Sequence, residues 1–386
     1  MSKKNQLKEI HVSGNSYAIY KSINGFDLYT DFSKKIILNN KNIHGFLNKK
    51  RISKKHKETD IFIGFFGYEL LNNLIGIKVP KQKSINFPKG IFYKPEKKIS
   101  YSNNLINYKD KKIRLKKKFK ININRKSYTK IFDKFKKKIK SGETYQIKIC
   151  TKYKLKSKID PLDLFCRLSK TNLAPEAFMI RDRNYSIISC SPENLITKKG
   201  SLITTKPIAG TVRKNKGMNK TKALSFFRNN LKETKEHNMI VDMERSDMSR
   251  ICKVGTVKLS KEKAVEEYKD LFHYVSLIKG KVKKNIRNVD IIKAMMPGGS
   301  VIGCPKISTL NLLNNQEKEN RNIYTGSFGY LKFNGDMRFN IIIRSILNYK
   351  NISEISVASG VVVDSNSKHE FGENFIKAKA LIDLFK

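Results

Sequence analysis

Residues 126–386 alternate between two hydrophobic patterns. Short apolar runs with a period of two predict strands, and longer runs with helical spacing predict helices. The strand-like runs are residues 147–155, 186–190, 202–205, 326–333, 340–347 and 355–363. The helical runs are residues 128–141, 161–170, 222–248, 307–314 and 371–385. The last three strand-like runs follow one another without a helix, which predicts antiparallel pairing and an α+β fold.

The first 125 residues have a different composition, which is rich in Lys and Asn and contains only short apolar segments. Residues 61–70 form the clearest of these segments and predict a buried strand or a strand followed by a turn. Residues 111–120 are so basic that we interpret them as a surface connection. No internal repeat and no long Gly/Ser- or Pro-rich linker separates residues 1–125 from residues 126–386. We therefore expect the two regions to share sheets as intertwined subdomains.

Charge is the most unusual feature of the composition. The chain has 386 residues, with 80 Lys and Arg against 33 Asp and Glu, and a formal net charge of +47. Such an excess is typical of nucleic-acid-binding proteins. Here, however, the basic residues are spread from Lys3 to Lys386 and do not gather in one patch or tail. We interpret most of them as a solvated surface, which leaves nucleic-acid binding as the less favoured alternative.

Several absences in the sequence indicate a compartment. No stretch of about 18 uncharged apolar residues is present, so no transmembrane helix is predicted. The basic N-terminus has no apolar segment behind it, so we expect no signal peptide. The five cysteines show no CxxC spacing, which disfavours a disulfide framework or a structural zinc site. Together these features predict a protein of the reducing cytoplasm.

Two pairs of acidic residues have a spacing that suits a metal ion. Glu233 and Glu236 lie three residues apart in a predicted helix, so their carboxylates share one face. Glu370 and Glu373 repeat this spacing near the start of the last predicted helix. The two pairs could together bind a hard divalent cation such as Mg²⁺, which prefers carboxylate oxygens and water. The alternative is that all four are ordinary acids of helix surfaces.

Other segments could bind an anionic ligand. The Gly-containing residues 207–211, 297–300 and 359–360 could present backbone N–H groups to a carboxylate, although each is also compatible with a plain tight turn. His273 lies in an apolar run and is either a core residue or a catalytic one. Arg344 ends a strongly apolar run, so it needs a carboxylate partner, either from a ligand or from the protein. A phosphate-binding loop motif is not present, and the cysteines lack the Gly-x-Cys-x-Gly setting of a glutaminase.

Taken in order, these segments resemble the large subunit of the chorismate-utilising enzymes, namely anthranilate synthase component I and aminodeoxychorismate synthase component I. The resemblance covers about residues 125–386 and implies their fold, in which helices flank large antiparallel sheets. Residues 1–125 match weakly, chiefly through residues 64–70. The matching segments are residues 141–146, 191–193, 207–211, 232–247, 273, 297–306, 324–330, 343–344 and 358–373.

The resemblance implies a role for each candidate residue. Glu236 and Glu373 resemble Mg²⁺ ligands, with Glu233 and Glu370 beside them. The metal would neutralise the ring carboxylate of chorismate and favour loss of the C4 hydroxyl. The residues that resemble the substrate cradle are Gln146, Ala209, Gly210, Thr211, Tyr324, Arg344, Ser359 and Gly360. The residues that resemble catalytic groups are His273 as the acid assisting the departing hydroxyl, Glu193 as an acid/base residue and Lys306 as a pocket cation.

Two sets of residues point to different products. In the family members that add water to chorismate, the position of Gln146 resembles that of a Lys that activates the water. Gln cannot act as that base. Many aminodeoxychorismate synthases carry a Lys at the position of Ala209, and its amine attacks C2 of chorismate. With Ala209 in that place, ammonia could attack C2 directly. Elimination of pyruvate would then give anthranilate. Residues 297–300 and 324–327, by contrast, look more like aminodeoxychorismate synthases. We favour anthranilate synthase and keep aminodeoxychorismate synthase as the alternative.

The resemblance also implies a partner. Because this chain lacks a glutaminase nucleophile, a separate glutaminase subunit would supply the ammonia. The chain departs from the family pattern at Ser246, which is usually Asn, and at Ala358, which is usually Gly. Ala358 can still serve if only its backbone N–H is used. Every proposed catalytic residue type is present, so we expect an active enzyme.

Overall fold

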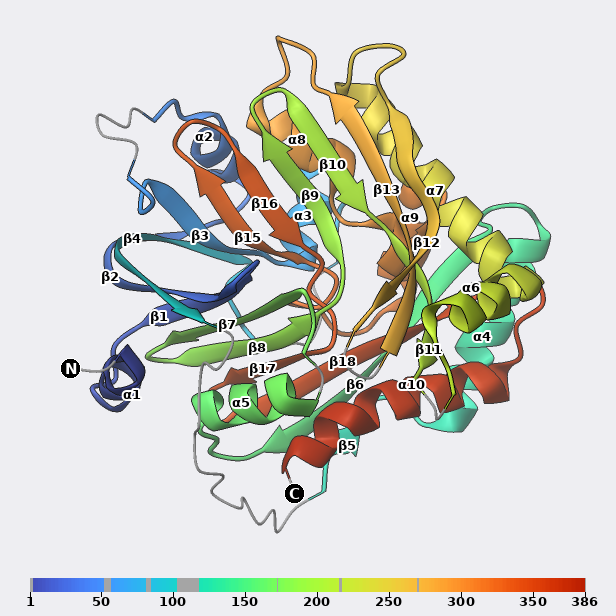
Figure 1. Ribbon diagram of the computed structural model, residues 1–386. Coiled ribbons are helices and arrows are strands. Elements are labelled where there is room, and N and C mark those ends of the chain that lie inside the picture. Colours follow the sequence, from blue (N-terminus) through green and yellow to red (C-terminus); the bar gives the residue numbers. More distant parts are fainter. Residues whose placement is uncertain are drawn as a thin grey trace.

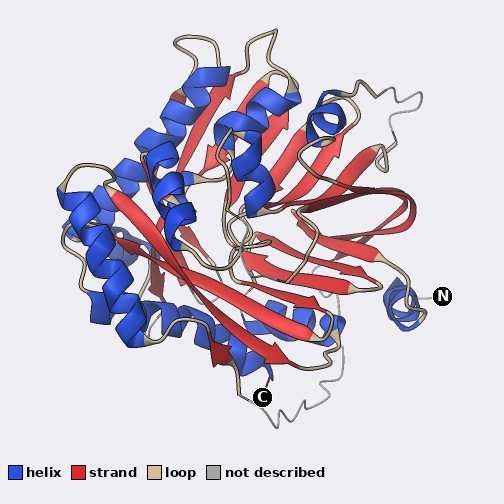
Figure 2. Ribbon diagram, turned by 180° about the vertical axis from the view of Figure 1, so that it is seen from behind, coloured by secondary structure: helices blue, strands red, loops and turns tan. Residues whose placement is uncertain are grey.

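The computed structural model is built around one connected series of antiparallel strands with helices packed against it (Figure 1). Seen from behind, the long helices lie on the outer side of the strands, and α1 stands apart from the other helices (Figure 2). The described residues are 3–51, 57–80, 85–102, 118–171, 173–214, 217–268 and 271–385.

The strands account for most of the chain's regular structure. In chain order they are β1 (Tyr17–Ser22), β2 (Gly25–Ile37), β3 (Ile61–Phe66), β4 (Gly90–Ser102), β5 (Lys120–Ile121), β6 (Gln146–Lys156), β7 (Glu176–Asp182), β8 (Tyr185–Ser191), β9 (Asn194–Lys199), β10 (Leu202–Lys206), β11 (Ile208–Arg213), β12 (Lys258–Glu267), β13 (Leu271–Lys281), β14 (Gly303–Cys304), β15 (Ser327–Lys332), β16 (Met337–Asn340), β17 (Ser345–Tyr349) and β18 (Ile352–Val361).

Neighbouring strands run in the order β6–β18–β17–β8–β7–β1–β2–β4–β3–β15–β16–β9–β10–β13, and every pair in this order is antiparallel. Strands β1 to β4, from the first 102 residues, lie in the middle of the series between β7 and β15. The N-terminal region therefore joins two groups of strands from later in the chain. This arrangement confirms the α+β fold of large antiparallel sheets in which two intertwined subdomains share strands.

Helices cover the strands locally. They are α1 (Lys3–Val12), α2 (Ile43–Asn48), α3 (Tyr68–Leu74), α4 (Arg125–Lys140), α5 (Pro161–Thr171), α6 (Lys220–Asn229), α7 (Leu231–Ile251), α8 (Asn288–Met295), α9 (Lys306–Gln316) and α10 (Ser367–Ile382), with 3₁₀ turns η1 (Gly299–Val301) and η2 (Asp383–Phe385). Helices α4 and α10 pack on β6 and β18, and α7 packs on β11 and β13.

Helix α4 illustrates how the sequence specifies these elements. The Asn124 side chain caps its first turn by accepting a backbone hydrogen bond, which satisfies one of the free N–H groups there. Tyr128, Phe132, Phe135 and Ile139 recur at spacings of four, three and four, and all are buried. The Lys-rich opposite face stays in water. The amphipathic helix expected over residues 128–141 is confirmed.

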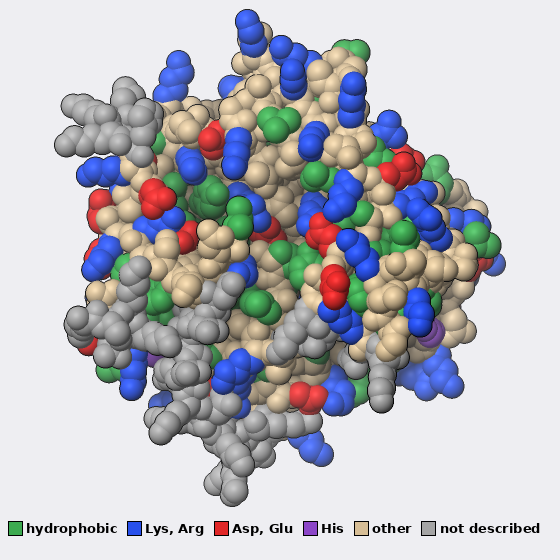
Figure 3. All heavy atoms as spheres, in the orientation of Figure 1, with side chains coloured by type: hydrophobic (Ala, Val, Ile, Leu, Met, Phe, Trp, Pro, Cys, Tyr) green, Lys and Arg blue, Asp and Glu red, His purple; other side chains and the backbone are tan. Residues whose placement is uncertain are grey.

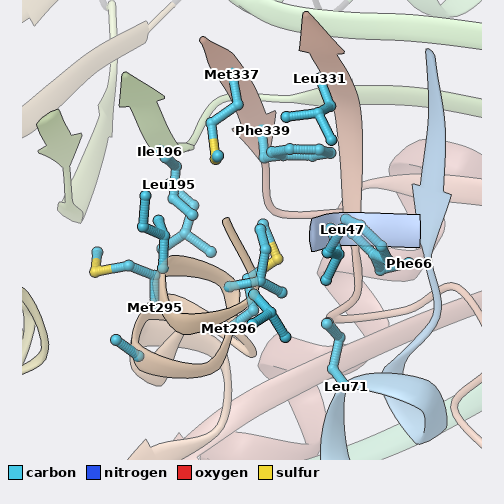
Figure 4. Packing of buried hydrophobic residues seen from close by; sticks show 14 of the residues in the cluster. Leu47, Phe66, Leu71, Leu195, Ile196, Met295, Met296, Leu331, Met337 and Phe339 are labelled. Atoms are coloured by element: carbon cyan, nitrogen blue, oxygen red, sulfur yellow. The ribbon is translucent and has the colours of Figure 1, made fainter. Parts of the chain in front are cut away.

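The largest apolar cluster lies between β9, β15 and β16 on one side and helices α2, α3 and α8 on the other (Figure 4). Leu195 of β9 and Phe339 of β16 point toward Met296, which follows α8. Phe66 at the end of β3 and Leu47 of α2 close the cluster. Burial of each such side chain contributes roughly 1.5–3 kcal/mol relative to exposure. The cluster thus anchors the N-terminal region to the later strands.

The predicted bounds of one helix and one strand were wrong. The single helix expected over residues 222–248 is divided into α6 and α7 at Asn230, whose side chain accepts a hydrogen bond from the backbone N–H of Glu233 and caps α7. The single strand expected over residues 340–347 is interrupted between β16 and β17. Arg344 lies in this interruption with φ of 49°, a left-handed conformation that cannot continue a strand.

Two segments expected as Gly-containing turns are strands. Residues 207–211 mostly belong to β11, where the register shifts between Ile208 and Thr211 and Gly210 has φ of 90°. Ser359 and Gly360 lie inside β18, and Gly360 pairs with Lys148 of β6. Ordinary cross-strand pairing therefore uses part of the backbone of Ser359 and Gly360.

Basic side chains are spread over the visible surface and do not gather on one element (Figure 3). This distribution agrees with a solvated surface and gives no support to a nucleic-acid footprint. Among the described residues, no helix combines the length and apolar character needed to cross a bilayer. The expected surface connection at residues 111–120 falls mostly outside the described residues.

Candidate functional site

The site is built around the pairing of β6 with β18. Side chains two residues apart on a strand share a face, so Gln146 and Lys148 project together. The Gln146 Nε2 donates to Glu236 Oε1 at 2.8 Å, and the Lys148 Nζ lies 2.9 Å from the same oxygen. Gly360 lies opposite Lys148, and a Cβ there would come within 2.7 Å of Lys148 Nζ and 3.0 Å of Gln146 Nε2. The glycine thus leaves the space that these two side chains fill.

Two helices bring carboxylates to this point. Glu236 comes from α7, and Glu370 and Glu373 come from α10. Potential ligand atoms of His369, Glu370 and Glu373 lie within 4.8 Å of one another. Glu236, Glu370 and Glu373 all interact electrostatically with the ammonium of Lys148. We call these three carboxylates with Lys148 the carboxylate cluster.

Charge interactions set the protonation of the cluster. Lys148 lowers the pKa of Glu236 to about 2, against the opposing effect of burial. Burial by itself would lower the pKa of Lys148, but Glu236 outweighs burial and the pKa of the lysine is raised. Lys148 is therefore an ammonium and Glu236 a carboxylate around neutral pH. Carboxylate oxygens from two helices fit the ligand preference of Mg²⁺, but Lys148 already places one positive charge among them.

Glu233, the fourth acid proposed as a metal neighbour, lies toward β11. A Cβ added to Gly210 would come within 3.0 Å of Glu233 Oε2 and 2.8 Å of the Phe227 ring. Gly210 also has φ of 90°, so both the space and the backbone conformation favour glycine. The carboxylate of Glu233 therefore borders the Gly210 backbone, and the spacing of the two acids along α7 places Glu236 one turn further.

His273 and Thr211 face each other on β13 and β11. They are register partners, and Thr211 Oγ1 lies 2.9 Å from His273 Nδ1. Burial, with a smaller contribution from Arg344, lowers the pKa of His273 to about 4. The imidazole is therefore neutral near pH 7 in the free protein. If the Thr211 hydroxyl donates to Nδ1, the single ring proton lies on Nε2; in the other tautomer Nδ1–H donates to the hydroxyl oxygen.

Arg344 is a half-buried cation near both His273 and Glu193. No ion pair joins its guanidinium to any acid among the residues that the structure describes. Burial lowers the pKa of Arg344 from its usual value, and Cys190 and Glu193 oppose this decrease only in part. A half-buried guanidinium without an ion pair is a receptor for a ligand carboxylate, which it can bind through two parallel N–H groups.

Glu193 is a carboxyl group suited to proton transfer. It precedes β9, is 5% exposed, and accepts a hydrogen bond from the Ser300 hydroxyl at 2.8 Å. Burial raises the pKa of Glu193 to about 7, while Ser300, Lys148 and Arg344 oppose the increase. A group with this pKa can hold or release a proton at working pH.

Replacing Ser300 with Ala is expected to shift the limb of the pH profile of kcat/KM that reports the ionisation of Glu193. The hydroxyl donates to the ionised carboxylate, so its loss should raise the pKa of Glu193 and move the limb in kcat/KM to higher pH by about half to one unit. The measurement is the pH profile of kcat/KM. Ser249→Ala, on an exposed face of α7, is the control and should leave the limb in place. An unmoved limb in Ser300→Ala would show that another group sets it.

The remaining expected residues divide between the site and the scaffold. Tyr324 is buried and packs with Cys150 and Ala358, beside the site strands. The Ser359 hydroxyl lies on the opposite face of β18 from Gly360, 2.8 Å from Tyr128 OH of α4, because side chains alternate along a strand. Only the backbone of Ser359 can therefore contact a ligand on the Gly360 face. Ala209 lies in β11 next to Gly210.

Lys306 requires a correction. Its ammonium is buried, pairs with Asp247 of α7 and donates to the Ala294 carbonyl at 3.0 Å. It also lines an open surface pocket with Arg250 and Lys293, and this pocket shares no lining residue with the carboxylate cluster. We therefore assign Lys306 a structural role, since Asp247 already neutralises the cation that was expected for the ligand.

Sequence reasoning missed Lys148, His369 and Ser300. The alternation of β6 carried a signal for Lys148, because a residue two positions after Gln146 shares its face. His369 adjoins Glu370 at the start of α10 and could have been added to the predicted acidic pair. Nothing local in the sequence indicated that Ser300 would contact Glu193.

Comparisons of the sequence with known proteins give matches over most of the chain. A family model described as chorismate binding enzyme matches residues 13–383. Aminodeoxychorismate synthase component 1 of Bacillus subtilis (strain 168) is 35% identical over 255 residues, covering 66% of this chain and 54% of that protein. Anthranilate synthase component 1 of Mycolicibacterium smegmatis is 33% identical over 265 residues, covering 66% of this chain and 50% of that protein. The chain thus spans about half the length of the curated relatives it matches.

Solved structures show the same fold. Anthranilate synthase component I from Streptococcus pneumoniae TIGR4 superposes with a TM-score of 0.76 at 24% identity, covering 95% of this chain and 90% of that one. The menaquinone-specific isochorismate synthase MenF from Escherichia coli gives a TM-score of 0.77 at 16% identity, covering 96% and 89%. An anthranilate synthase component and an isochorismate synthase therefore share this fold.

Proposed function

Because the chain belongs to the chorismate-binding enzymes, we propose that it is the large subunit of a Mg²⁺-dependent synthase that aminates chorismate and forms anthranilate. The observation that carries the proposal is the half-buried guanidinium of Arg344, which forms no ion pair among the described residues and lies near His273 and Glu193. A cation of this kind suits a carboxylate substrate. The neighbouring carboxylate cluster supplies the ligands for a divalent cation.

The chain's own residues would share the work as follows. Arg344 binds one carboxylate of chorismate and orients the ring. Glu236, Glu370 and Glu373 would hold Mg²⁺, which when bound neutralises the other carboxylate and favours departure of the C4 hydroxyl. His273, neutral with its proton on Nε2, donates a hydrogen bond to that hydroxyl as it leaves. Glu193 holds or accepts a proton with a pKa of about 7.

The choice of anthranilate rests on Ala209. A methyl side chain cannot occupy C2 of the substrate as an amine would, so ammonia is free to attack that carbon. Addition of ammonia at C2 with loss of the C4 hydroxyl gives 2-amino-2-deoxyisochorismate. Elimination of pyruvate from this compound then leaves the aromatic ring.

The alternative product, 4-amino-4-deoxychorismate, is favoured by the Gly298 and Ser300 markers. The packing gives both residues another explanation. A Cβ on Gly298 would lie 2.7 Å from Cδ1 of Ile341, so glycine there accommodates a neighbouring side chain. The Ser300 hydroxyl binds Glu193, which a Thr hydroxyl could do equally. These markers therefore weigh less than the absence of an amine at residue 209.

Addition of water, as in isochorismate synthases, is less well supported. The Gln146 amide donates to Glu236 and has no basic nitrogen. Lys148 offers an amine two residues further on, but Glu236 holds it as an ammonium with a raised pKa. Neither side chain is a base while Lys148 pairs with Glu236.

Ammonia would come from a separate glutaminase subunit. Burial raises the pKa of the Cys150 and Cys190 thiols to about 12, and it also raises the pKa of Cys252 and Cys304. Thiols of this kind are poor nucleophiles. This supports a chain that uses ammonium by itself and glutamine only with a partner.

The purified chain, given chorismate and Mg²⁺, is expected to form anthranilate and pyruvate with ammonium and no product with glutamine. Fluorescence and mass of the product distinguish anthranilate from 4-amino-4-deoxychorismate. Ala209→Lys places an amine beside C2 and should lose anthranilate in favour of a covalent adduct or a 4-amino product. A 4-amino product from the wild-type chain would make the alternative correct. Turnover of glutamine by the single chain would contradict the separate glutaminase.

A further inference from the structure

Lys148 occupies the point at which the proposed metal ligands converge. Its Nζ lies 2.9 Å from Glu236 Oε1 and also interacts electrostatically with Glu370 and Glu373. Its side chain is 14% exposed and that of Glu236 is 25% exposed, so water screens the pair only partly. The lysine therefore brings a positive charge to all three carboxylates, and Lys377 brings a second one to Glu236 and Glu373.

The surrounding strands hold Lys148 in this position. Its backbone N–H donates to the Ile302 carbonyl at 3.0 Å, and its own carbonyl accepts from the buried Arg321 guanidinium at 2.9 Å. Gly360, its cross-strand neighbour, has no side chain in the path of the ammonium, since a Cβ there would lie 2.7 Å from Nζ. The lysine is thus an integral part of the site.

A divalent cation and Lys148 compete for the same oxygen. Glu236 Oε1 already accepts from both Lys148 and Gln146. A metal ion that binds this oxygen must displace the ammonium, because two cations at one carboxylate oxygen repel each other. A substrate carboxylate arriving at the cluster would give the displaced ammonium a new partner.

We propose that Lys148 is an internal counter-ion that fills the carboxylate cluster in the metal-free protein and must leave Glu236 before a divalent cation binds. The proposal rests on the proposed function, because the cation is part of it. Lys148 then weakens metal binding to the free protein and couples that binding to arrival of an anionic substrate. Lys377 pairs with Glu373 at 2.7 Å and also acts on Glu236, but its pair with Glu373 is more exposed than the pair of Lys148 with Glu236.

The test measures metal binding directly, without turnover. Titration of the full-length chain with MgCl2 by calorimetry, and with MnCl2 by electron paramagnetic resonance, gives the dissociation constant of each variant. Lys148→Met should bind either ion about tenfold more tightly than wild type. In metal-free buffer its melting temperature should fall by a few degrees, because three carboxylates lose their counter-ion, and MgCl2 should restore it.

Two controls separate the charge from the position. Lys148→Arg keeps the charge and should bind the metal within about threefold of wild type. Lys154→Met removes a lysine from the same strand, where it pairs with Glu319 at 2.6 Å away from the cluster, and should bind the metal as wild type does. Adding Glu236→Gln to Lys148→Met should abolish the tighter binding.

The outcomes distinguish this proposal from the proposed function. If Lys148→Met binds Mg²⁺ no more tightly than wild type, the counter-ion role is wrong, whatever product the enzyme makes. If Lys154→Met gains as much affinity for the metal as Lys148→Met, the gain comes from the lower net charge of the protein. The counter-ion role of Lys148 is then likewise wrong. If the tighter binding appears but wild type aminates no chorismate, the function falls and the counter-ion role stands.

Discussion

Glu236→Gln is expected to lower Mg²⁺-supported turnover of chorismate by about a thousandfold while the fold persists. Lys148 holds the pKa of Glu236 at about 2, so this residue is a carboxylate at every working pH. Gln keeps the shape but removes the charge that a divalent cation requires. The measurement is kcat with ammonium over a range of MgCl2 concentrations, together with a circular dichroism spectrum that checks folding.

Glu262→Gln is the matched control. Glu262 lies on β12 with 61% of its side chain exposed, beside Lys263 at 3.7 Å. Its replacement removes the same charge from outside the carboxylate cluster and should leave kcat unchanged. If Glu236→Gln kept near-normal turnover with an unchanged Mg²⁺ requirement, the assignment of Glu236 as a metal ligand would be wrong.

Lys306→Met is expected to destabilise the protein by about 3–5 kcal/mol, because it leaves Asp247 charged and buried without its cation. The two side chains are 6% and 5% exposed, so water cannot replace the lost partner. Glu244 lies close enough to Asp247 to interact with it, and burial and Asp247 together raise the pKa of Glu244 to about 8. The free energy of unfolding by urea is the measurement.

A double variant tests this explanation. Lys306→Met combined with Asp247→Asn removes both charges and should recover most of the lost stability. If Lys306 instead acts as a ligand cation, the single variant would raise KM for chorismate and leave the free energy of unfolding unchanged. That result would restore the role that the sequence resemblance implied for Lys306.

Local patterns in the sequence determined a large part of the fold. The period-two runs and the apolar stripe of α4 identified most strands and helices after residue 125, because these patterns record which side faces the core. The same reasoning failed at Asn230 and Arg344. A capping side chain starts a second helix at Asn230, and Arg344 takes a left-handed conformation between two strands. The cap at Asn230 is a local contact with Glu233 that the sequence already offered, whereas no local pattern marks the conformation of Arg344.

Within the site, the sequence by itself determined which chemical groups were available. Acids three apart on helices must share a face, so the Glu233–Glu236 and Glu370–Glu373 pairs could be recognised without coordinates. The absence of an amine at Ala209 and of a basic nitrogen at Gln146 was also plain from residue identity. These residue identities restrict which reactions the site can carry out, because they decide which functional groups are present wherever the side chains lie.

Only the tertiary structure decided how those groups are partnered. Lys148 meets Glu236 because β6 pairs with β18 in the register that places Gly360 opposite the lysine. Lys306 lies against Asp247, which removed it from the list of ligand cations, whereas Arg344 was left with no acid among the described residues. Strand register and helix packing join residues far apart in sequence through long-range contacts. Local periodicity carries no information about such contacts, so the charge balance of the site emerged only from the folded chain.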